Sequence, residues 1–162
     1  MTYLVVYESA FGNTREVAQA VAAGLGDGTE AVDVGSAPAL EGLDVDLLVI
    51  GGPTHAFGMS RPQTREDAVG RGGHPSSTGI REWLDAAAGA TLRVATFDTH
   101  TRKPNLPGTA SKAAAKRLRA MGCTTVAQPE KFWVDGDRGP LLDGEAERAR
   151  AWGAGLREAS TP

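Results

Sequence analysis

The sequence predicts an α/β protein built on a single doubly wound, five-stranded parallel sheet. Apolar segments alternate in kind along the 162 residues, first a short strand-like run and then a segment with helical spacing. Three of the runs are almost continuously apolar, which is typical of central parallel strands covered on both faces. No repeat, low-complexity region or linker divides the chain. We therefore expect residues 1–162 to form one domain.

The strands are expected at five places. The continuous apolar runs predict central strands at Tyr3–Tyr7 and at residues 47–50 and 94–97. A shorter alternating run at residues 31–34 predicts an edge strand with Val32 and Val34 on one face. The last strand is expected in two parts, at residues 124–127 and 131–134, because Pro129 between them has no N–H for a ladder. This interruption places it at an edge of the sheet.

Four helices are expected between and after these strands. Each has apolar residues at helical spacing, and the four stripes begin at Val17, Ile80, Ala110 and Ala149. Gly26 and Gly122 follow the first and third stripes and favour helix ends there. Asp143 is the expected N-cap of the last helix, and a short turn is expected near residues 38–40.

Composition and charge argue against several classes of function. The net charge is −3, from 17 basic and 20 acidic side chains, which gives no electrostatic case for a nucleic-acid partner. The single cysteine, Cys123, permits no intrachain disulfide, and the three histidines lack metal-ligand spacing. No apolar run approaches the length of a membrane span, and the N-terminus leads directly into a strand. We expect a cytoplasmic protein with no membrane partner.

The loop between the first strand and the first helix has the character of an anion-binding site. The first N–H groups of a helix lack intrahelical partners and carry partial positive charge. Ser9, Asn13 and Thr14 add side-chain donors, and Gly12 allows close approach of the backbone to an oxygen. The loop has neither the lysine of a triphosphate site nor GxGxxG spacing. It therefore suits a single phosphomonoester better, although an ordinary tight turn with an Asn or Thr cap uses the same residue types.

The spacing around this loop favours the phosphate interpretation. The run from Val5 to Val21, with Ser9, Gly12 and Thr14 at fixed positions, resembles the N-terminal signature of flavodoxins, in which this loop holds the phosphate of FMN. The resemblance implies a flavodoxin-like fold with strand order 2-1-3-4-5 and FMN as the cofactor. It also implies that the phosphate is bound by Ser9, Ala10, Phe11, Gly12, Asn13 and Thr14.

The resemblance implies that two further loops lie beside the flavin ring. In the segment of residues 51–58, the residues expected at the ring are Pro53, Thr54, His55, Phe57 and Gly58. Phe57 is the stacking candidate, and a position in the protein core fits it equally well. The third loop is expected to begin with Asp98, Thr99 and His100. Many flavodoxins have a tyrosine in this loop, and this chain has none there.

Two groups of basic residues have more than one interpretation. Residues 59–79 form a long connection with arginines, expected either as a lid or partner surface or as a solvated loop. The helix predicted from Ala110 carries Lys112, Lys116, Arg117 and Arg119 without matching acids. These side chains form either a solvated face or a docking patch for an acidic redox partner.

The resemblance implies an FMN-binding electron-transfer protein that works with a redox protein partner, both a reductase and an acceptor. An alternative is an FMN-dependent NAD(P)H:quinone or small-molecule oxidoreductase. The near-neutral charge, the long connection and the missing tyrosine favour this alternative, and the short chain disfavours it. A third hypothesis is a binding module that kept the fold and lost the flavin. The sequence favours the electron carrier and leaves open whether the protein is an enzyme.

Overall fold

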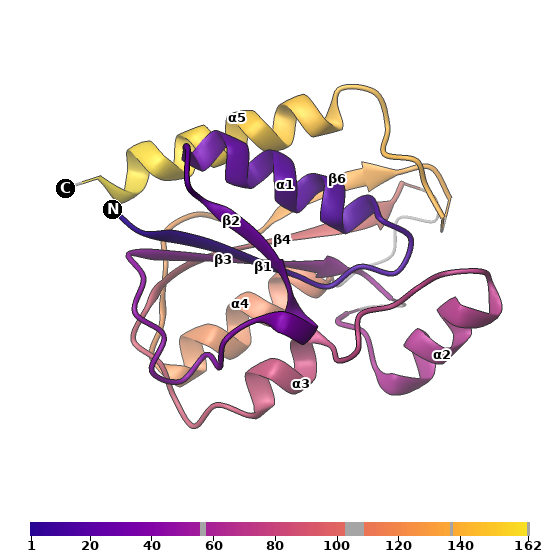
Figure 1. The fold of residues 1–162 in the computed structure, drawn as a ribbon, viewed down its shortest axis with the longest axis horizontal. Coiled ribbons are helices and arrows are strands. Elements are labelled where there is room, and N and C mark those ends of the chain that lie inside the picture. The colour runs from indigo at the N-terminus through magenta and orange to yellow at the C-terminus, as the bar shows by residue number, and fades with distance from the viewer. Residues whose placement is uncertain (56–57, 103–108, 137, 162) are drawn as a thin grey trace.

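The computed structural model describes residues 1–55, 58–102, 109–136 and 138–161. Its centre is a parallel sheet in the order β2-β1-β3-β4-β5, with β6 also paired to β4, so the predicted order 2-1-3-4-5 is confirmed (Figure 1). The strands are β1 (Tyr3–Tyr7), β2 (Glu30–Asp33), β3 (Leu47–Pro53), β4 (Arg93–Thr101), β5 (Thr124–Thr125) and β6 (Glu130–Val134).

Helices cover both faces of the sheet, as the predicted doubly wound fold requires. Helices α1 (Asn13–Leu25) and α5 (Glu145–Ser160) lie on one face, and α3 (Ile80–Asp85) and α4 (Ala110–Met121) lie on the other (Figure 1). Alternate side chains of β1 enter two separate cores: Val5 packs beneath α1 and α5, and Val6 packs against the α3 and α4 layer. Residues 4–7 of β1 and residues 47–50 of β3 are all buried between these two helix layers, which is why both strands show continuous apolar runs.

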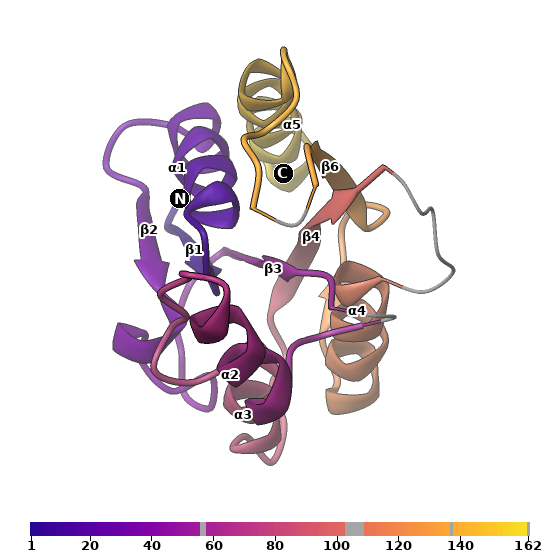
Figure 2. The same cartoon turned by 90° about the vertical axis from the view of Figure 1, so that its right-hand side faces the viewer.

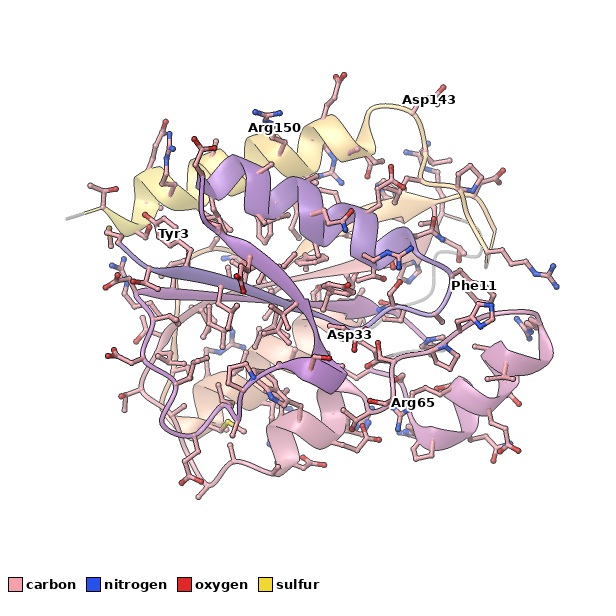
Figure 3. All side chains as sticks on the ribbon, in the orientation of Figure 1. Tyr3, Phe11, Asp33, Arg65, Asp143 and Arg150 are labelled. Atoms are coloured by element: carbon pink, nitrogen blue, oxygen red, sulfur yellow. The ribbon has the colours of Figure 1, made fainter. Side chains whose placement is uncertain are left out.

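The two helices on the first face approach each other unusually closely. A Cβ atom built on Gly153 of α5 would lie 2.3 Å from the carbonyl oxygen of Val21. A Cβ atom built on Gly24 of α1 would lie 2.0 Å from the carbonyl oxygen of Arg150. Both distances are far shorter than a van der Waals contact, so the α1–α5 crossing depends on glycine at both positions. Figure 3 shows Arg150 on α5, directly over α1.

Several predicted strand ends are wrong. Strand β3 continues to Pro53 rather than ending at Ile50, and β5 ends at Thr125 rather than at Ala127. Strand β4 continues to Thr101 rather than ending at Phe97, because β6 pairs with residues 97–101 in parallel. Strand β2 ends at Asp33, because Val34 begins a 3-10 helix, Val34–Ser36, whose first turn is capped by the Asp33 carboxylate. The turn expected near residues 38–40 lies close to a hydrogen-bonded turn in which the Leu43 N–H donates to the Leu40 carbonyl, and the 3-10 helix precedes it. The predicted interruption of the last strand is confirmed, since β5 and β6 are separate strands that both pair with β4.

The helices differ from expectation at two places. Residues 59–79 contain a helix, α2 (Pro62–Gly70), that the sequence pattern did not indicate. Only Ala68 of α2 is buried, so the helix has no apolar stripe to reveal it. The last helix is capped by Gly144 rather than by the predicted Asp143, which lies in the preceding loop (Figure 3). Gly144 has a φ of 84°, a left-handed conformation that glycine adopts without strain.

Candidate binding site

A cleft of about 390 Å³ lies at the carboxyl ends of the strands. The loop after β1 and the segment after β3 form two of its walls, and α2, β4 and the end of β6 complete it. Figure 2 looks onto this end of the sheet, where α1 begins and α2 lies in front of the strands. Nine of the sequence-predicted site residues line the cleft together: Ser9, Ala10, Phe11, Asn13, Thr14, Pro53, Thr54, His55 and Thr99. A volume of this size is within the usual range for small-molecule sites, roughly 300–1,000 Å³.

The loop after β1 presents a group of free backbone donors. Gly12 is the N-cap of α1 and has a φ of 92°, which turns the chain sharply into the helix. Within the described chain, no acceptor bonds to the N–H groups of Ala10, Phe11, Asn13 or Thr14. The N–H groups of Asn13 and Thr14 lie in the first turn of α1, where every helix has donors without intrahelical partners, and those of Ala10 and Phe11 add two more. Together they can bind a ligand with several acceptor oxygens.

The three predicted side-chain donors of this loop have different roles. The Ser9 hydroxyl accepts a hydrogen bond from the Gly12 N–H at 3.1 Å and keeps its own proton to donate. The Asn13 amide instead donates to the Arg138 carbonyl at 2.9 Å, and this bond ties the start of α1 to the segment after β6. The Thr14 hydroxyl is 2.8 Å from the Thr99 hydroxyl. One hydroxyl of this buried pair donates to the other, so one hydroxyl proton remains for a ligand.

The segment after β3 forms a second wall of the cleft. The Thr54 N–H donates to the Thr99 carbonyl, and the Thr54 hydroxyl accepts from the Ala110 N–H at 3.0 Å. Burial lowers the pKa of the neighbouring His55 imidazole, and the positive charges of Arg65 and Arg71 lower it further. His55 is therefore neutral over a wider pH range than a free histidine. The backbone of His55 is paired with that of Gly58, which does not line the cleft; Phe57 lies outside the described residues.

Two predicted residues of the third loop belong to strand β4 and do not line the cleft. Asp98 is completely buried on the α4 side of the sheet, where its Oδ2 accepts from the Ser111 N–H at 2.9 Å. It stabilises the N-terminal turn of α4, where a negative charge is favoured. His100 lies on the same face, with its ring 5.9 Å from that of Trp133. Thr99 stands between them and faces the cleft, because side chains alternate along a strand.

The structure adds lining residues that the sequence did not indicate. Helix α2, β4 and the end of β6 supply them: Thr64, Asp67, Ala68, Arg71, Thr101, Val134 and Gly136. A signal for α2 was available, since Pro62 occupies the first helical position and the Thr64 hydroxyl bonds to the backbone of Arg61. The α2 helix is also tied to α3, where Arg65 pairs with Glu82 at 2.5 Å. No comparable local signal marks Val134 or Gly136, which reach the cleft only through the pairing of β6 with β4.

The first residue after β1, Glu8, has a buried carboxyl group. Glu8 is 3% exposed, and its Oε1 accepts from the Ile80 N–H at the start of α3, at 2.8 Å. Burial raises the pKa of Glu8 above its ordinary value, although bonds from Ser60 and Ile80 and the charge of Arg65 oppose this change. Glu8 is thus protonated more readily in the folded protein than in the unfolded chain.

We expect the Glu8→Gln variant to be more stable than the wild type at pH 7. A raised folded pKa means that the Glu8 contribution is greatest below about pH 4.5 and is lost as the pH rises through the folded pKa. The amide keeps the acceptor for Ile80 without the buried charge. Urea unfolding from pH 4 to 8 measures this, with Glu41→Gln in an exposed loop as the control. A stability difference that is independent of pH would contradict the prediction.

Two other kinds of feature are missing from the described residues. No group of three or more His, Cys, Asp or Glu side chains there is arranged to hold a metal ion. No helix in the same part of the chain has both the length and the hydropathy of a transmembrane segment.

Comparisons with solved structures identify the architecture. A flavodoxin from the domain Archaea superimposes with a TM-score of 0.70 and 20% identity, over 99% of this chain and 99% of that chain. Flavodoxin 2 from Bacillus cereus gives 0.68 and 20%, over 99% and 97%. The Streptococcus pneumonia TIGR4 flavodoxin gives 0.70 and 17%, over 99% and 100%. The chain has a flavodoxin-like fold. The comparison with protein-family models and that with curated proteins gave no match. In this flavodoxin-like fold the cleft lies where the strand order reverses between β1 and β3, the usual ligand position in open α/β sheets.

Proposed function

We propose that the chain binds FMN in this cleft and transfers electrons between redox partner proteins, with residues 1–162 acting as one domain. The observation that carries the proposal is the set of four unpaired N–H groups at Ala10, Phe11, Asn13 and Thr14. These donors surround the N-terminus of α1, where an anion is favoured by the helix dipole. The structural similarity to flavodoxins supports the same assignment.

The residues present fit the two ends of FMN. The free N–H groups and the Thr14 and Thr99 hydroxyls would hold the phosphate, while Pro53, Thr54 and His55 would lie along the ring. When bound, FMN supplies chemistry that accepts or donates one or two electrons. The protein contributes orientation and a partly water-excluding cleft. A neutral His55, whose pKa is lowered by burial, adds no positive charge beside the ring at pH 7.

Absorbance and fluorescence titrations with FMN test this proposal. We expect a yellow complex with a perturbed flavin spectrum and quenched flavin emission, and weaker binding of riboflavin, which lacks the phosphate. A protein that changes neither signal at micromolar FMN would overturn the proposal and leave the flavin-free binding module. Rapid NADPH oxidation by the FMN-loaded protein alone would instead identify the NAD(P)H-dependent oxidoreductase.

We also infer that the partner surface includes the start of α4. Lys112 and Lys116 are exposed on this helix, and the N–H of Ala110 in its first turn bonds to Thr54 in the cleft wall. Arg117, in contrast, pairs with Asp85 at 2.6 Å. The two lysines would attract an acidic protein toward the cleft edge.

Reversing both lysine charges should slow electron transfer to an anionic oxidant. With Lys112→Glu and Lys116→Glu combined, we expect reoxidation of the reduced FMN protein by ferricyanide to slow about threefold to tenfold at low salt. The difference should shrink at high salt, because exposed charges are screened. The combination of Arg150→Glu and Arg157→Glu on α5 makes the same change in net charge as a control. Equal slowing by both pairs would show an effect of net charge rather than of α4.

A further inference from the structure

The connection between α2 and α3 is bonded to the loop that follows β1. We call residues 73–77 of this connection the strap. The His74 N–H donates to the Ala10 carbonyl at 2.7 Å, and the Ser76 N–H donates to the Ser9 carbonyl at 3.1 Å. The structure describes all five strap residues, and none of them lines the cleft. The strap thus contacts the loop from outside the cleft.

The strap is held by a hydrogen-bond chain that begins at the end of β2. The Ser76 hydroxyl donates to the Asp33 carboxylate at 2.7 Å and accepts from the Ser9 N–H at 3.2 Å. A hydroxyl has one proton, so donation to Asp33 leaves its lone pairs directed to the Ser9 N–H. Asp33 is itself fixed, because its other oxygen accepts from the Gly35 N–H at 2.8 Å. Figure 3 shows Asp33 and Phe11 at the same end of the sheet.

Close packing also keeps the strap next to the loop. A Cβ atom built on Gly73 would lie 2.8 Å from the Phe11 ring and 3.0 Å from the Ala68 carbonyl oxygen. The strap can therefore pass between α2 and the loop only because position 73 is glycine, which has no side chain. Position 73 is buried, and its backbone N–H donates to that same Ala68 carbonyl at 2.8 Å.

These contacts determine where two loop N–H groups point. A peptide unit is planar and trans, so its N–H is directed opposite to its C=O. The carbonyls of Ser9 and Ala10 are bound by the strap, and the same two peptide units contain the N–H groups of Ala10 and Phe11. Both N–H groups are therefore directed away from the strap. They are two of the four donors that lack an acceptor in the described chain.

We propose that Asp33 and Ser76 are positioning residues that give the cleft its preference for a phosphorylated flavin over an unphosphorylated one. They hold the loop through Ser9, and the strap N–H groups bound to the Ser9 and Ala10 carbonyls then direct the Ala10 and Phe11 N–H groups toward the phosphate. This inference rests on the proposed FMN function and adds to it the residues that set selectivity. Removing the Ser76 hydroxyl frees the Ser9 N–H and leaves the Asp33 Oδ2 without its serine donor, so the loop donors lose their common orientation.

The test compares dissociation constants of FMN and riboflavin by fluorescence quenching in the full chain. For Ser76→Ala we expect FMN affinity to fall about fivefold to tenfold, the equivalent of one weakened hydrogen bond to a charged group. Riboflavin affinity should stay within about twofold, because riboflavin has no phosphate to contact these donors. Ser77→Ala is the matched control, since this neighbouring strap serine is exposed and has no described bond to the loop. Ser76→Thr keeps the hydroxyl and should keep the preference.

The outcomes separate the two proposals. If the wild type binds neither flavin, the proposed function is wrong and the inference falls with it. If the wild type prefers FMN and Ser76→Ala retains the full preference, only the inference is overturned. Equal weakening of both flavins would also overturn it, because that result indicates general loosening of the cleft. If circular dichroism shows that Ser76→Ala is unfolded, Asp33→Asn replaces it. This variant keeps an acceptor for Gly35 but loses the carboxylate facing Ser76, and an unchanged preference overturns the inference.

Discussion

The Gly153→Ala variant should lose about 2 kcal/mol of its free energy of unfolding, although alanine is the better helix former. The added methyl group would lie 2.3 Å from the Val21 carbonyl oxygen and 3.1 Å from its carbon. These are backbone atoms, which cannot rotate aside as a side chain can. Helices α1 and α5 must therefore move apart along the crossing that covers one face of the sheet. Urea unfolding, followed by circular dichroism, measures the loss.

Gly155→Ala is the matched control for this prediction. Gly155 lies in the same helix, two residues further on, is exposed, and has nothing within 4 Å of a built Cβ atom. There the change should raise the free energy of unfolding by about 0.5–1 kcal/mol, the ordinary gain from glycine to alanine in a helix. The two variants should thus change stability in opposite directions. Equal effects at the two positions would mean that the α1–α5 crossing is wider than the structure shows.

The sequence predicted the parts of the fold that depend on local hydrophobic pattern. Strand β1 was predicted with its observed bounds, because every residue from Leu4 to Tyr7 is buried between the two helix layers. The end of β4 was missed for a physical reason. Asp98, Thr99 and His100 are polar and resemble loop residues, and only the pairing with β6, about thirty residues away, extends the strand through them. Pairing between distant segments leaves no periodic signal in either one.

In the candidate site, too, the features set by a local segment were predicted and those set by contacts between distant segments were missed. The loop after β1 is a continuous segment with a recognisable spacing, and the structure places five of its six predicted residues in the cleft wall. The remaining one, Gly12, supplies the turn behind the wall. Lining residues from α2 were missed because α2 has one buried residue and is held by Arg65 and Glu82 rather than by a core. The strap was missed because it contacts the loop mainly through the backbone N–H groups of His74 and Ser76, for which one sequence offers no residue-type signature.

Removing the Thr14 hydroxyl should have the largest effect on the proposed phosphate site. Thr14 is 2% exposed and pairs with the Thr99 hydroxyl at 2.8 Å across the floor of the cleft. Thr14→Val keeps the shape of the side chain, removes one donor and leaves Thr99 without its partner. We expect FMN affinity to fall at least about tenfold, the usual cost of a lost hydrogen bond to a charged group. Titration of the purified protein with FMN measures it.

Two comparisons connect this loss to the phosphate rather than to the cleft as a whole. Thr14→Ser keeps the hydroxyl and should retain most of the FMN affinity, whereas riboflavin should bind the wild type and Thr14→Val almost equally. If both flavins bind Thr14→Val more weakly by the same factor, the Thr14–Thr99 pair supports the shape of the cleft and does not contact a phosphate. The pair joins α1 to β4, so that outcome should be accompanied by a lower free energy of unfolding in the flavin-free protein. Because the two explanations predict different effects on riboflavin, the ratio of the two affinities decides between them.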